Sequence, residues 1–414
     1  MQTSVISLAK NIVGSGVLAL AGGVAAFSNR KIAVLPATVV LLILGAISAY
    51  TFSLIARVGD AVGADTYKEA WSKVISERSS VLVAATTTFM TCAAALSYAI
   101  IIGDSFASIA TLAGAPALLR RPNAWILLLS ATVLLPLSLL RDLSALVGAS
   151  IIGTLGTLYT TLFTTKRFFD RSYAPGGRFL EGLPLQPSFG SSGSVINPSI
   201  FYLVSMCATA YVAHYNAPRF YNELAAPADG KSKLGRFNLV SASGFGLAAA
   251  ISAILMSMGF LTFGSVSQGY ILNNYATQDV GALIARLGIG VSIVTSYPLN
   301  FVALREGVCS LFNLSKYSHR NDFHWAITLL LLCTFNGIAL VMKDLGLIAA
   351  LGGAILGSAV VYIYPALMFI ANMNRKKAAG ESLSKGQRTE ILVNKGLVAL
   401  GSVLGAVGAW SCLK

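Results

Sequence analysis

Apolar runs of about twenty residues follow one another along almost the whole chain, and they constrain the fold more than any other feature. A run of that length is what a helix needs to cross the hydrocarbon core of a bilayer. Only 11% of the residues are charged, whereas a soluble domain carries about a quarter. The runs do not show the two-residue alternation of a membrane β-barrel. The sequence therefore predicts an all-α integral membrane protein.

Eleven transmembrane helices are predicted, forming a single transmembrane domain over residues 1–414. The predicted crossings are residues 3–26, 32–57, 81–113, 124–140, 143–165, 199–221, 239–263, 280–304, 324–341, 346–371 and 396–413. The stretch 166–197, rich in Gly, Pro and Ser, is expected to be a loop outside the membrane. We expect a first repeat over about 1–165, a second over about 198–371, and an extra helix over about 396–413.

Basic residues are distributed unevenly between the alternate loops. With the N-terminus in the cytoplasm, 18 Lys and Arg fall in cytoplasmic loops and 10 in the opposite loops, while Lys10 and Arg286 fall inside crossings. An excess of basic residues on the cytoplasmic side is the usual bias. Basic loops facing anionic membrane lipid also account for the net charge of +14 without a nucleic-acid partner. We predict a multi-pass protein with its N-terminus inside and its C-terminus outside, and the basic stretch 375–395 as one cytoplasmic loop.

The first and sixth crossings contain residues that interrupt a helix. Residues 14–16 of the first crossing read Gly-Ser-Gly, and residues 208–213 of the sixth are small or polar. A helix broken inside a bilayer must satisfy its freed backbone groups, which favours a cavity with a bound ligand. Such breaks, five crossings apart, are typical of secondary transporters built as five-plus-five inverted repeats. Close packing against another helix is the alternative interpretation of the two glycines.

Several stretches of the chain resemble the amino acid/auxin permease family, within it the sodium-coupled neutral amino acid transporters and their vacuolar relatives. They are residues 11–18, 97–104, 135–143 with Ser150, His214 and Asn216 with 221–224, and Pro298 and Arg305 with 344–346. The resemblance implies eleven helices in the bacterial leucine-transporter fold, with substrate held between helices one and six. It also implies alternating access, symport coupled to protons or sodium, and a plasma or vacuolar/lysosomal-type membrane.

A free neutral amino acid would bring a carboxylate and an ammonium group to such a site. The predicted substrate-binding residues are Gly14, Ser15, Gly16, Tyr98, Ala208, Thr209 and Tyr211. We expect N–H groups of 14–16 to bind the carboxylate, as helix N-termini bind anions, and carbonyls of 208–211 to bind the ammonium. The resemblance places Tyr98 near the pocket, where its hydroxyl could reach the carboxylate. An interfacial or packing position is the alternative for this tyrosine.

The resemblance also places a cation site between the first helix, at Val13, and Thr295 and Ser296 on the eighth. Hydroxyl and carbonyl oxygens suit a hard cation. Lys10 stands one turn before the break, where sodium-coupled members of the family carry a small or amide residue. Its ammonium group could fill the cation site, which favours proton coupling over sodium coupling. Snorkelling of Lys10 to the membrane surface is the alternative.

Other polar residues suggest structural roles. His214 and Asn216 follow the sixth-helix break, which favours a gate or a packing network over substrate contact. Asp104 and the pairs Arg305–Glu306 and Lys343–Asp344 are expected at helix ends, the pairs as loop ion pairs or partners of helix dipoles.

The residues favour a transporter over other membrane proteins. A membrane sensor that binds amino acid without transporting it is the alternative function. An enzyme is not predicted, because His214, His319 and His324 stand at unrelated depths and form no catalytic or metal-binding constellation. No cofactor beyond a coupling ion is expected, and the sequence indicates no particular oligomeric state.

Overall fold

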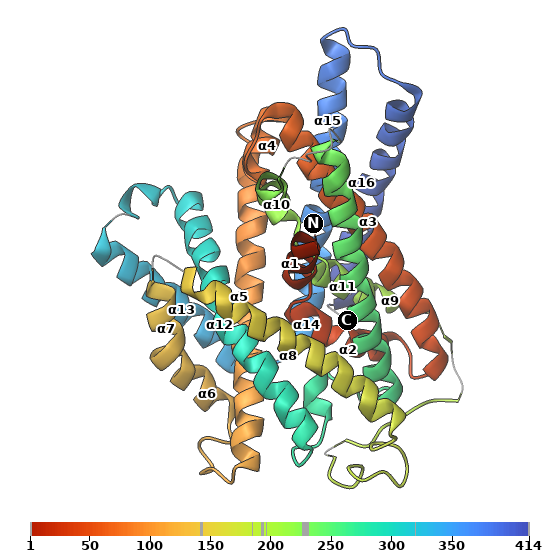
Figure 1. The fold of residues 1–414 in the computed structure, drawn as a ribbon, viewed down its shortest axis with the longest axis vertical. Coiled ribbons are helices and arrows are strands. Elements are labelled where there is room, and N and C mark those ends of the chain that lie inside the picture. Colours follow the sequence, from red (N-terminus) through yellow and green to blue (C-terminus); the bar gives the residue numbers. More distant parts are fainter. Residues whose placement is uncertain are drawn as a thin grey trace.

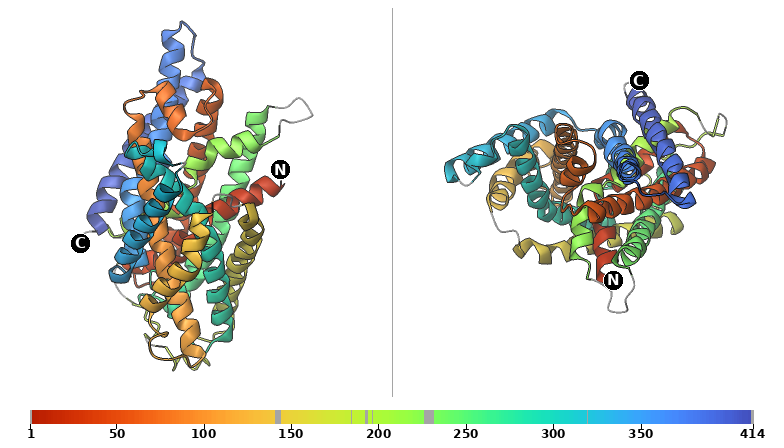
Figure 2. Two further views of the ribbon diagram at one scale, coloured as in Figure 1. Left: turned by 90° about the vertical axis from the view of Figure 1, so that its left-hand side faces the viewer. Right: turned by 90° about the horizontal axis from the view of Figure 1, so that it is seen from above.

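The structure, a computed structural model, describes residues 2–140, 144–183, 185–191, 194–195, 197–225, 232–318 and 320–412. Its helices stand side by side along the long axis of an elongated molecule (Figures 1 and 2). They are α1 (Gln2–Ile12), α2 (Leu20–Phe27), α3 (Val34–Val62), α4 (Tyr67–Val74), α5 (Ser80–Leu112), α6 (Pro122–Leu129), α7 (Leu135–Leu139), α8 (Ser144–Phe169), α9 (Ile200–Ala210), α10 (Ala217–Glu223), α11 (Lys233–Phe263), α12 (Val280–Leu311), α13 (Asn321–Val341), α14 (Leu345–Leu351), α15 (Tyr364–Ala378) and α16 (Lys385–Cys412). Short 3₁₀ or π-helical segments adjoin them: η1 (Ser15–Ala19), η2 (Lys31–Ala33), η3 (Ser130–Leu134), η4 (His214–Asn216), η5 (Ile271–Asn274), η6 (Ser315–Tyr317) and η7 (Gly352–Ile363). Residues 141–143, His319 and the side chain of Ser150, singled out above, lie outside the described part.

Many of these helices are long and apolar enough to cross a membrane. Eight of them qualify in the described residues, and the bent pair Gln2–Ile12 and Ser15–Phe27 adds a ninth if it is counted as one span. The eight are Lys31–Val62, Ser80–Leu112, Pro122–Leu139, Lys233–Phe263, Val280–Leu311, Asn321–Val341, Leu345–Ala378 and Lys385–Cys412. The chain is therefore a multi-pass, all-helical membrane protein, as predicted. The other two predicted crossings coincide with α8 and with the broken helix α9–α10, so a count of eleven stays a prediction.

Two groups of helices make up the molecule. In one group α12 packs along α5 and α8, and α6 and α13 pack against α5. In the other, α11 packs on α3 and α1, while α9 packs on α2, η7 and α16. Both broken crossings, α1–α2 and α9–α10, belong to the second group. The candidate site is thus built mainly by one of the two groups.

Connections between helices alternate between the two ends of the molecule. α4, α10 and the α15–α16 hairpin lie at one end, at the top of Figure 1, which we call the hairpin end. The α5–α6 connection and the long segment after α8 lie at the opposite end, which we call the loop end. This alternation agrees with the predicted order of crossings. The excess of basic residues predicts that the hairpin end faces the cytoplasm.

The stretch 375–395 is not the loop predicted from its charge, because α15 and α16 extend into it from both sides. Lys, Arg, Gln and Glu are good helix formers, and a capping box starts α16. The Gln387 N–H donates to Ser384 Oγ at 3.2 Å, and the Ser384 N–H donates to Gln387 Oε1 at 2.9 Å. The extra helix, predicted over 396–413, therefore begins at Lys385 and forms a hairpin that projects beyond the other helices (Figure 1).

A polar cluster joins this hairpin to α3. The Arg57 guanidinium donates to both carboxylate oxygens of Glu390, at 2.5 and 3.0 Å. The Tyr50 hydroxyl donates to Glu390 at 3.0 Å, and Asn394 Nδ2 donates to the Tyr50 hydroxyl at 2.7 Å. The Arg57 guanidinium also lies over the Phe369 ring of α15, 5.2 Å from its centroid. The hairpin is thus attached to the group of helices that carries both breaks.

Candidate substrate site at the helix breaks

The first break separates α1 from η1 and α2, which are bent by 51° from one another. Gly14 is extended there, with φ −112° and ψ −155°. The N–H groups of Val13 and Gly14 donate to the carbonyls of Ala9 and Ile12 at 2.8 and 2.9 Å. Among described residues, nothing accepts a bond from the N–H groups of residues 15 and 16. Free N–H groups at the start of a helix can bind an anion.

The second break follows α9, which ends at Ala210. The next two N–H groups, of Tyr211 and Val212, donate back to the carbonyls of residues 207 and 209 at 3.0 and 3.2 Å. In the described part of the chain, the carbonyls of Ala208 and Ala210 accept no hydrogen bond. Two such carbonyls are suited to accept hydrogen bonds from an ammonium group.

The two breaks lie against each other. A Cβ atom added to Gly16 would lie 3.1 Å from Ala210 Cα and 3.4 Å from Thr209 Cγ2. The backbones of η1 and α9 are therefore in contact, and a side chain at position 16 would force them apart by a few tenths of an ångström. A Cβ atom at Gly14 would meet nothing within 4 Å, and Gly14 is exposed. The free N–H groups and the free carbonyls thus belong to adjoining backbones, beside open space at Gly14.

The side chains of Thr209 and Tyr211 are occupied in helix packing. The Thr209 hydroxyl donates to the Ala349 carbonyl of α14 at 2.5 Å. Tyr211 is fully buried, and its hydroxyl donates to the Leu41 carbonyl of α3 at 3.0 Å. At these two positions the structure therefore leaves the backbone, more than the side chain, for a ligand.

His214 and Asn216 link the second break to other helices. His214 is fully buried, with its Nε2 atom 2.9 Å from Thr51 Oγ1 and 3.2 Å from the Ser48 carbonyl of α3. Asn216 Nδ2 donates to Asn11 Oδ1 of α1 at 3.2 Å. The amide pair connects the two broken crossings directly. The sequence indicated Asn11 only as part of the stretch 11–18 that resembles the family and predicted no contact for it, although an amide inside an apolar crossing was a usable signal.

The residues of the predicted cation site are divided between the two groups of helices. Lys10, partly buried, and Val13 belong to the α1 region, which packs on α11. Thr295 and Ser296 belong to α12, and the Thr295 hydroxyl donates to carbonyls of its own helix at 3.0 Å. Tyr98 of α5 lies near this part of α12, because its ring centroid is 6.4 Å from that of Tyr297.

Three charged residues were expected at helix ends, and the structure places only one of them there. Arg305 lies within α12 and is buried, and its Nη1 atom donates to the Ser138 carbonyl at 2.8 Å and to Thr328 Oγ1 at 2.9 Å. Asp104 lies within α5, which continues to residue 112. Asp344 does cap a helix, because its side chain accepts from the first turn of α14. Long helices thus place the first two inside the protein.

The segment 264–279 covers the loop end of the broken crossings. A Cβ atom at Gly22 of α2 would lie 2.9 Å from the Gln268 carbonyl. A Cβ atom at Gly269 would collide with the backbone of Gly346 at the start of α14. At these two glycines the backbone of the segment is in direct contact with α2 and with the start of α14. The helix breaks are therefore covered at the loop end and exposed beside α1.

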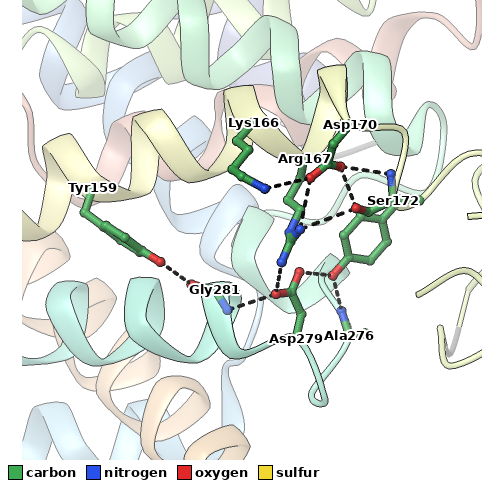
Figure 3. A network of polar contacts seen from close by, with 9 residues as sticks. Tyr159, Lys166, Arg167, Asp170, Ser172, Ala276, Asp279 and Gly281 are labelled. Carbon is green, nitrogen blue, oxygen red and sulfur yellow. Dashed lines mark hydrogen bonds and ion pairs between the residues drawn. The ribbon is translucent and has the colours of Figure 1, made fainter. Parts of the chain in front are cut away.

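A buried ion pair holds the start of α12 at the loop end (Figure 3). The Asp279 carboxylate is fully buried and accepts from Arg167 Nη2 at 2.6 Å, the Tyr173 hydroxyl at 2.9 Å and the Gly281 N–H at 2.9 Å. The Tyr173 hydroxyl in turn accepts from the Ala276 N–H at 3.1 Å. The end of α8, the loop after it and the covering segment are thereby tied together.

Asp170 extends this network toward solvent. Partial burial acts to raise the pKa of its carboxyl group, but hydrogen bonds from Ser172, Lys166 and Arg167 outweigh burial and lower the pKa to about 2. The carboxylate is therefore charged in all but strongly acidic solution.

Helical membrane transporters of known structure share this fold. The transporter MhsT in complex with L-phenylalanine gives a TM-score of 0.54 at 13% identity, covering 100% of this chain and 98% of that chain. Mhp1, a nucleobase-cation-symport-1 family transporter in a closed conformation with bromovinylhydantoin bound, gives 0.58 at 10% identity, covering 99% and 91%. At such identities the likeness concerns the fold alone. The fold is that of all-helical, leucine-transporter-like membrane transporters.

Comparison of the sequence with known families assigns the chain to one of them. Residues 1–410 match the family described as transmembrane amino acid transporter protein, and the chain belongs to that family. A putative sodium-coupled neutral amino acid transporter 11 of Danio rerio is 27% identical over 381 residues, 90% of this chain and 79% of the relative. Vacuolar amino acid transporter 5 of Schizosaccharomyces pombe is 25% identical over 410 residues, 97% of this chain and 91% of the relative. Vacuolar amino acid transporter 2 of Saccharomyces cerevisiae is 23% identical over 396 residues, covering 92% and 78%.

Proposed function

We propose that this chain is a secondary active transporter that moves neutral amino acids across a plasma or vacuolar/lysosomal-type membrane by alternating access. The observation that carries the proposal is the contact of Gly16 with Ala210, which sets one helix break against the other. Names of relatives that include neutral amino acid and vacuolar amino acid transporters support the substrate class. The two breaks would occupy equivalent positions in two inverted repeats.

The zwitterion of an amino acid is complementary to the backbone groups at the breaks. Its carboxylate would accept from the N–H groups of Ser15 and Gly16, and its ammonium would donate to the carbonyls of Ala208 and Ala210. Each group is left without a partner in the described chain, so substrate would relieve the cost of burying unpaired polar groups. The open space beside Gly14 is where the substrate would enter.

Alternating access would come from rotation of α1 about Gly14. This residue is extended and free of close neighbours, so its dihedral angles can change without collisions. The Asn11–Asn216 hydrogen bond is the contact that such a rotation would break. At the loop end, segment 264–279 would have to separate from α2 to admit substrate. Exposure of the breaks would then switch from one end to the other.

Lys10 is our proposal for the coupling group. An ionisable side chain within a crossing is costly and often functional. In the proposed cycle its ammonium occupies the cation site beside Thr295 and Ser296, and deprotonation in the inward-facing state vacates that site. Loss of the proton then loosens the contact between the first and eighth crossings. Transport would follow the proton gradient and would not need sodium.

The test is uptake by purified protein in liposomes, with each of the twenty L-amino acids, sodium replaced by choline, and the lumen either alkaline or at equal pH. Accumulation without sodium, driven by the pH gradient, is expected. Lys10→Ala should lose the pH dependence and keep at most downhill exchange. Lys376→Ala, which removes a lysine that pairs with Glu381 in the hairpin, is the matched control and should transport normally.

Two other results of this uptake assay would contradict different parts of the proposal. Strict sodium dependence would rule out the lysine mechanism and leave sodium as the coupling ion. Binding of an amino acid without flux would overturn transport in favour of an amino acid sensor.

A further inference from the structure

α16 is packed on one face only. Its buried residues recur at intervals of three and four, and they are Asn394, Leu397, Gly401, Leu404 and Gly408. This face contacts η7, α9 and α15. The opposite face is exposed along the whole helix, and Figure 2 shows α16 at the outside of the helix bundle in both views. Because α16 is long and apolar enough to span a membrane, its outward face is in contact with lipid.

This outward face changes from basic to apolar along the helix. Its large apolar side chains are more than half exposed, and they are Leu392, Val403 and Trp410. Three exposed basic residues stand at the hairpin end of the same face, and we call them the cation stripe: Lys385, Arg388 and Lys395. Since residues three and four apart lie on one side of a helix, the stripe and the apolar part form one continuous surface.

The apolar part of the face has the length of the hydrocarbon core. Leu392 and Trp410 are 18 residues apart, which corresponds to about 27 Å of helix, and the core is about 30 Å thick. Tryptophan is also frequent at the boundary of the core. Arg388 then lies about 6 Å beyond Leu392 and Lys385 about 10 Å beyond it, in and at the edge of a headgroup layer about 5–8 Å thick. Lys395 lies less than one turn inside the boundary, from where a lysine side chain extends back to the headgroups.

No carboxylate neutralises the cation stripe in the described part of the chain. Glu390 is the only acidic residue of α16, and it accepts hydrogen bonds from Arg57 and Tyr50 of α3. Glu381, in the turn of the hairpin, pairs with Lys376 of α15. Three cations therefore face the headgroup layer without a counter-ion from the protein.

We propose that the cation stripe binds the headgroup of an anionic phospholipid, whose acyl chains lie along Leu392 and the apolar face below it. Such a lipid is complementary to both parts of the face, whereas an acidic protein or a free phosphate ion is complementary to the basic part alone. Anionic lipids are concentrated in the cytoplasmic leaflet, which the hairpin end is predicted to face. Since α16 touches α9 where Gly408 meets Ser205, the bound lipid helps to hold the helix that precedes the second break.

The experiment compares two lipids on the purified full chain in a neutral detergent. The probes are phosphatidylglycerol and phosphatidylcholine with the same fluorophore on an acyl chain, and the wild type is expected to bind phosphatidylglycerol more tightly. One cation near an anionic headgroup is worth about fivefold in affinity. Arg388→Gln should therefore weaken phosphatidylglycerol binding about fivefold, and the triple variant Lys385→Gln, Arg388→Gln, Lys395→Gln about a hundredfold. Binding of phosphatidylcholine should not change.

A matched control removes two lysines and one arginine from the same end of the molecule. It combines Lys68→Gln in α4, Arg78→Gln in the connection after α4 and Lys377→Gln in α15. This control should bind phosphatidylglycerol as the wild type does. All six side chains are exposed, so both triple variants should unfold in detergent at the wild-type temperature. If the triple variant of the stripe is unstable, the fivefold loss in Arg388→Gln decides.

Competition identifies the occupant, because glycerol phosphate supplies the anionic headgroup without acyl chains. Unlabelled phosphatidylglycerol should displace the probe at far lower concentration than glycerol phosphate. Equal displacement by the two would overturn the inference in favour of a simple anion site. Equal affinity of the wild type for both lipids would also overturn it, as would an equal loss in the two triple variants, because charge at this end in general would then attract the lipid. The inference needs only a membrane-spanning chain, so none of these results bears on the proposed transport.

Discussion

Replacing Gly16 and Gly14 separately by alanine should give opposite effects on stability. The new methyl group at position 16 would lie 3.1 and 3.2 Å from two backbone atoms of Ala210. Carbon atoms prefer about 3.5–4.0 Å, so the methyl overlaps them by about half an ångström. Backbone atoms cannot rotate away as a side chain can. The expected cost is in the range of overpacking, about 1–3 kcal/mol.

Gly14 is the matched control, because the same methyl group would meet open space there. Its φ of −112° is negative, so alanine there does not enter the left-handed region. Alanine restricts the unfolded chain more than glycine does, which stabilises the folded protein by about 0.4–1 kcal/mol. Gly14→Ala should therefore be as stable as the wild type or more stable, while Gly16→Ala should be less stable.

The assay combines thermal unfolding of the purified protein with uptake in liposomes. Gly16→Ala should unfold at a lower temperature and lose apparent substrate affinity by about tenfold, since 1.4 kcal/mol corresponds to a factor of ten. Gly16→Val should abolish uptake. Gly14→Ala should remain stable but should lower uptake if substrate occupies the space beside residue 14. Gly14→Val should abolish uptake. A Gly16→Ala protein with wild-type unfolding temperature and unchanged KM would refute the contact of the two breaks as the basis of the site.

Three further outcomes are expected. Asp279→Ala should destabilise the protein by about 3–5 kcal/mol, because it leaves Arg167 half-buried beside an empty acceptor site. Asp279→Asn should destabilise it less. Equal unfolding temperatures for wild type and Asp279→Ala would contradict a stabilising role of the Arg167–Asp279 ion pair. The pKa of Asp170 is lowered to about 2 in the folded protein. Its ionised carboxylate should therefore add at most about 1 kcal/mol, after solvent screening, to the free energy of unfolding. This stabilisation should be present above the ordinary pKa of an aspartate and should fade as the pH falls toward 2. The unfolding temperatures of wild type and Asp170→Asn should therefore differ at pH 7 and converge in acid, and a constant difference would contradict this. Epitope tags should report the N-terminus on the cytoplasmic side and the loop 170–197 on the other, whereas both termini on one side would contradict the order of crossings.

Much of the fold could be predicted because membrane spans depend on length and hydropathy alone. The predicted crossing 81–113 coincides with α5 almost to the residue. Helices at the membrane surface were missed, since charge was taken as a sign of a loop. The stretch 375–395 was misjudged for that reason, although its Ser384 and Gln387 form a capping box. α4 was likewise not predicted, although a helix-capping residue precedes it: Thr66 Oγ1 accepts from the Glu69 N–H at 3.1 Å.

The helix breaks could be located from the sequence, but the contacts around them could not. Gly-Ser-Gly inside a crossing indicates a break wherever it occurs. That Gly16 faces Ala210, while Gly14 faces open space, depends on how two distant crossings pack. Arg286 stood out only as a charge inside a crossing. Its two carbonyl partners follow from the fold of segment 264–279, which has no hydropathy signal.

The close packing around α9 makes the two broken crossings mechanically unequal. The Thr209 hydroxyl donates to the α14 backbone, and Gly353 and Gly408 bring η7 and α16 directly against Ser205. A helix held by backbone contacts on several sides moves only together with its neighbours. α1, in contrast, packs mainly on α11 and ends at an unobstructed glycine. In the proposed transport cycle the sixth crossing would therefore stay fixed while α1 moves, so the speed of turnover should depend on the contacts of α1 more than on those of α9.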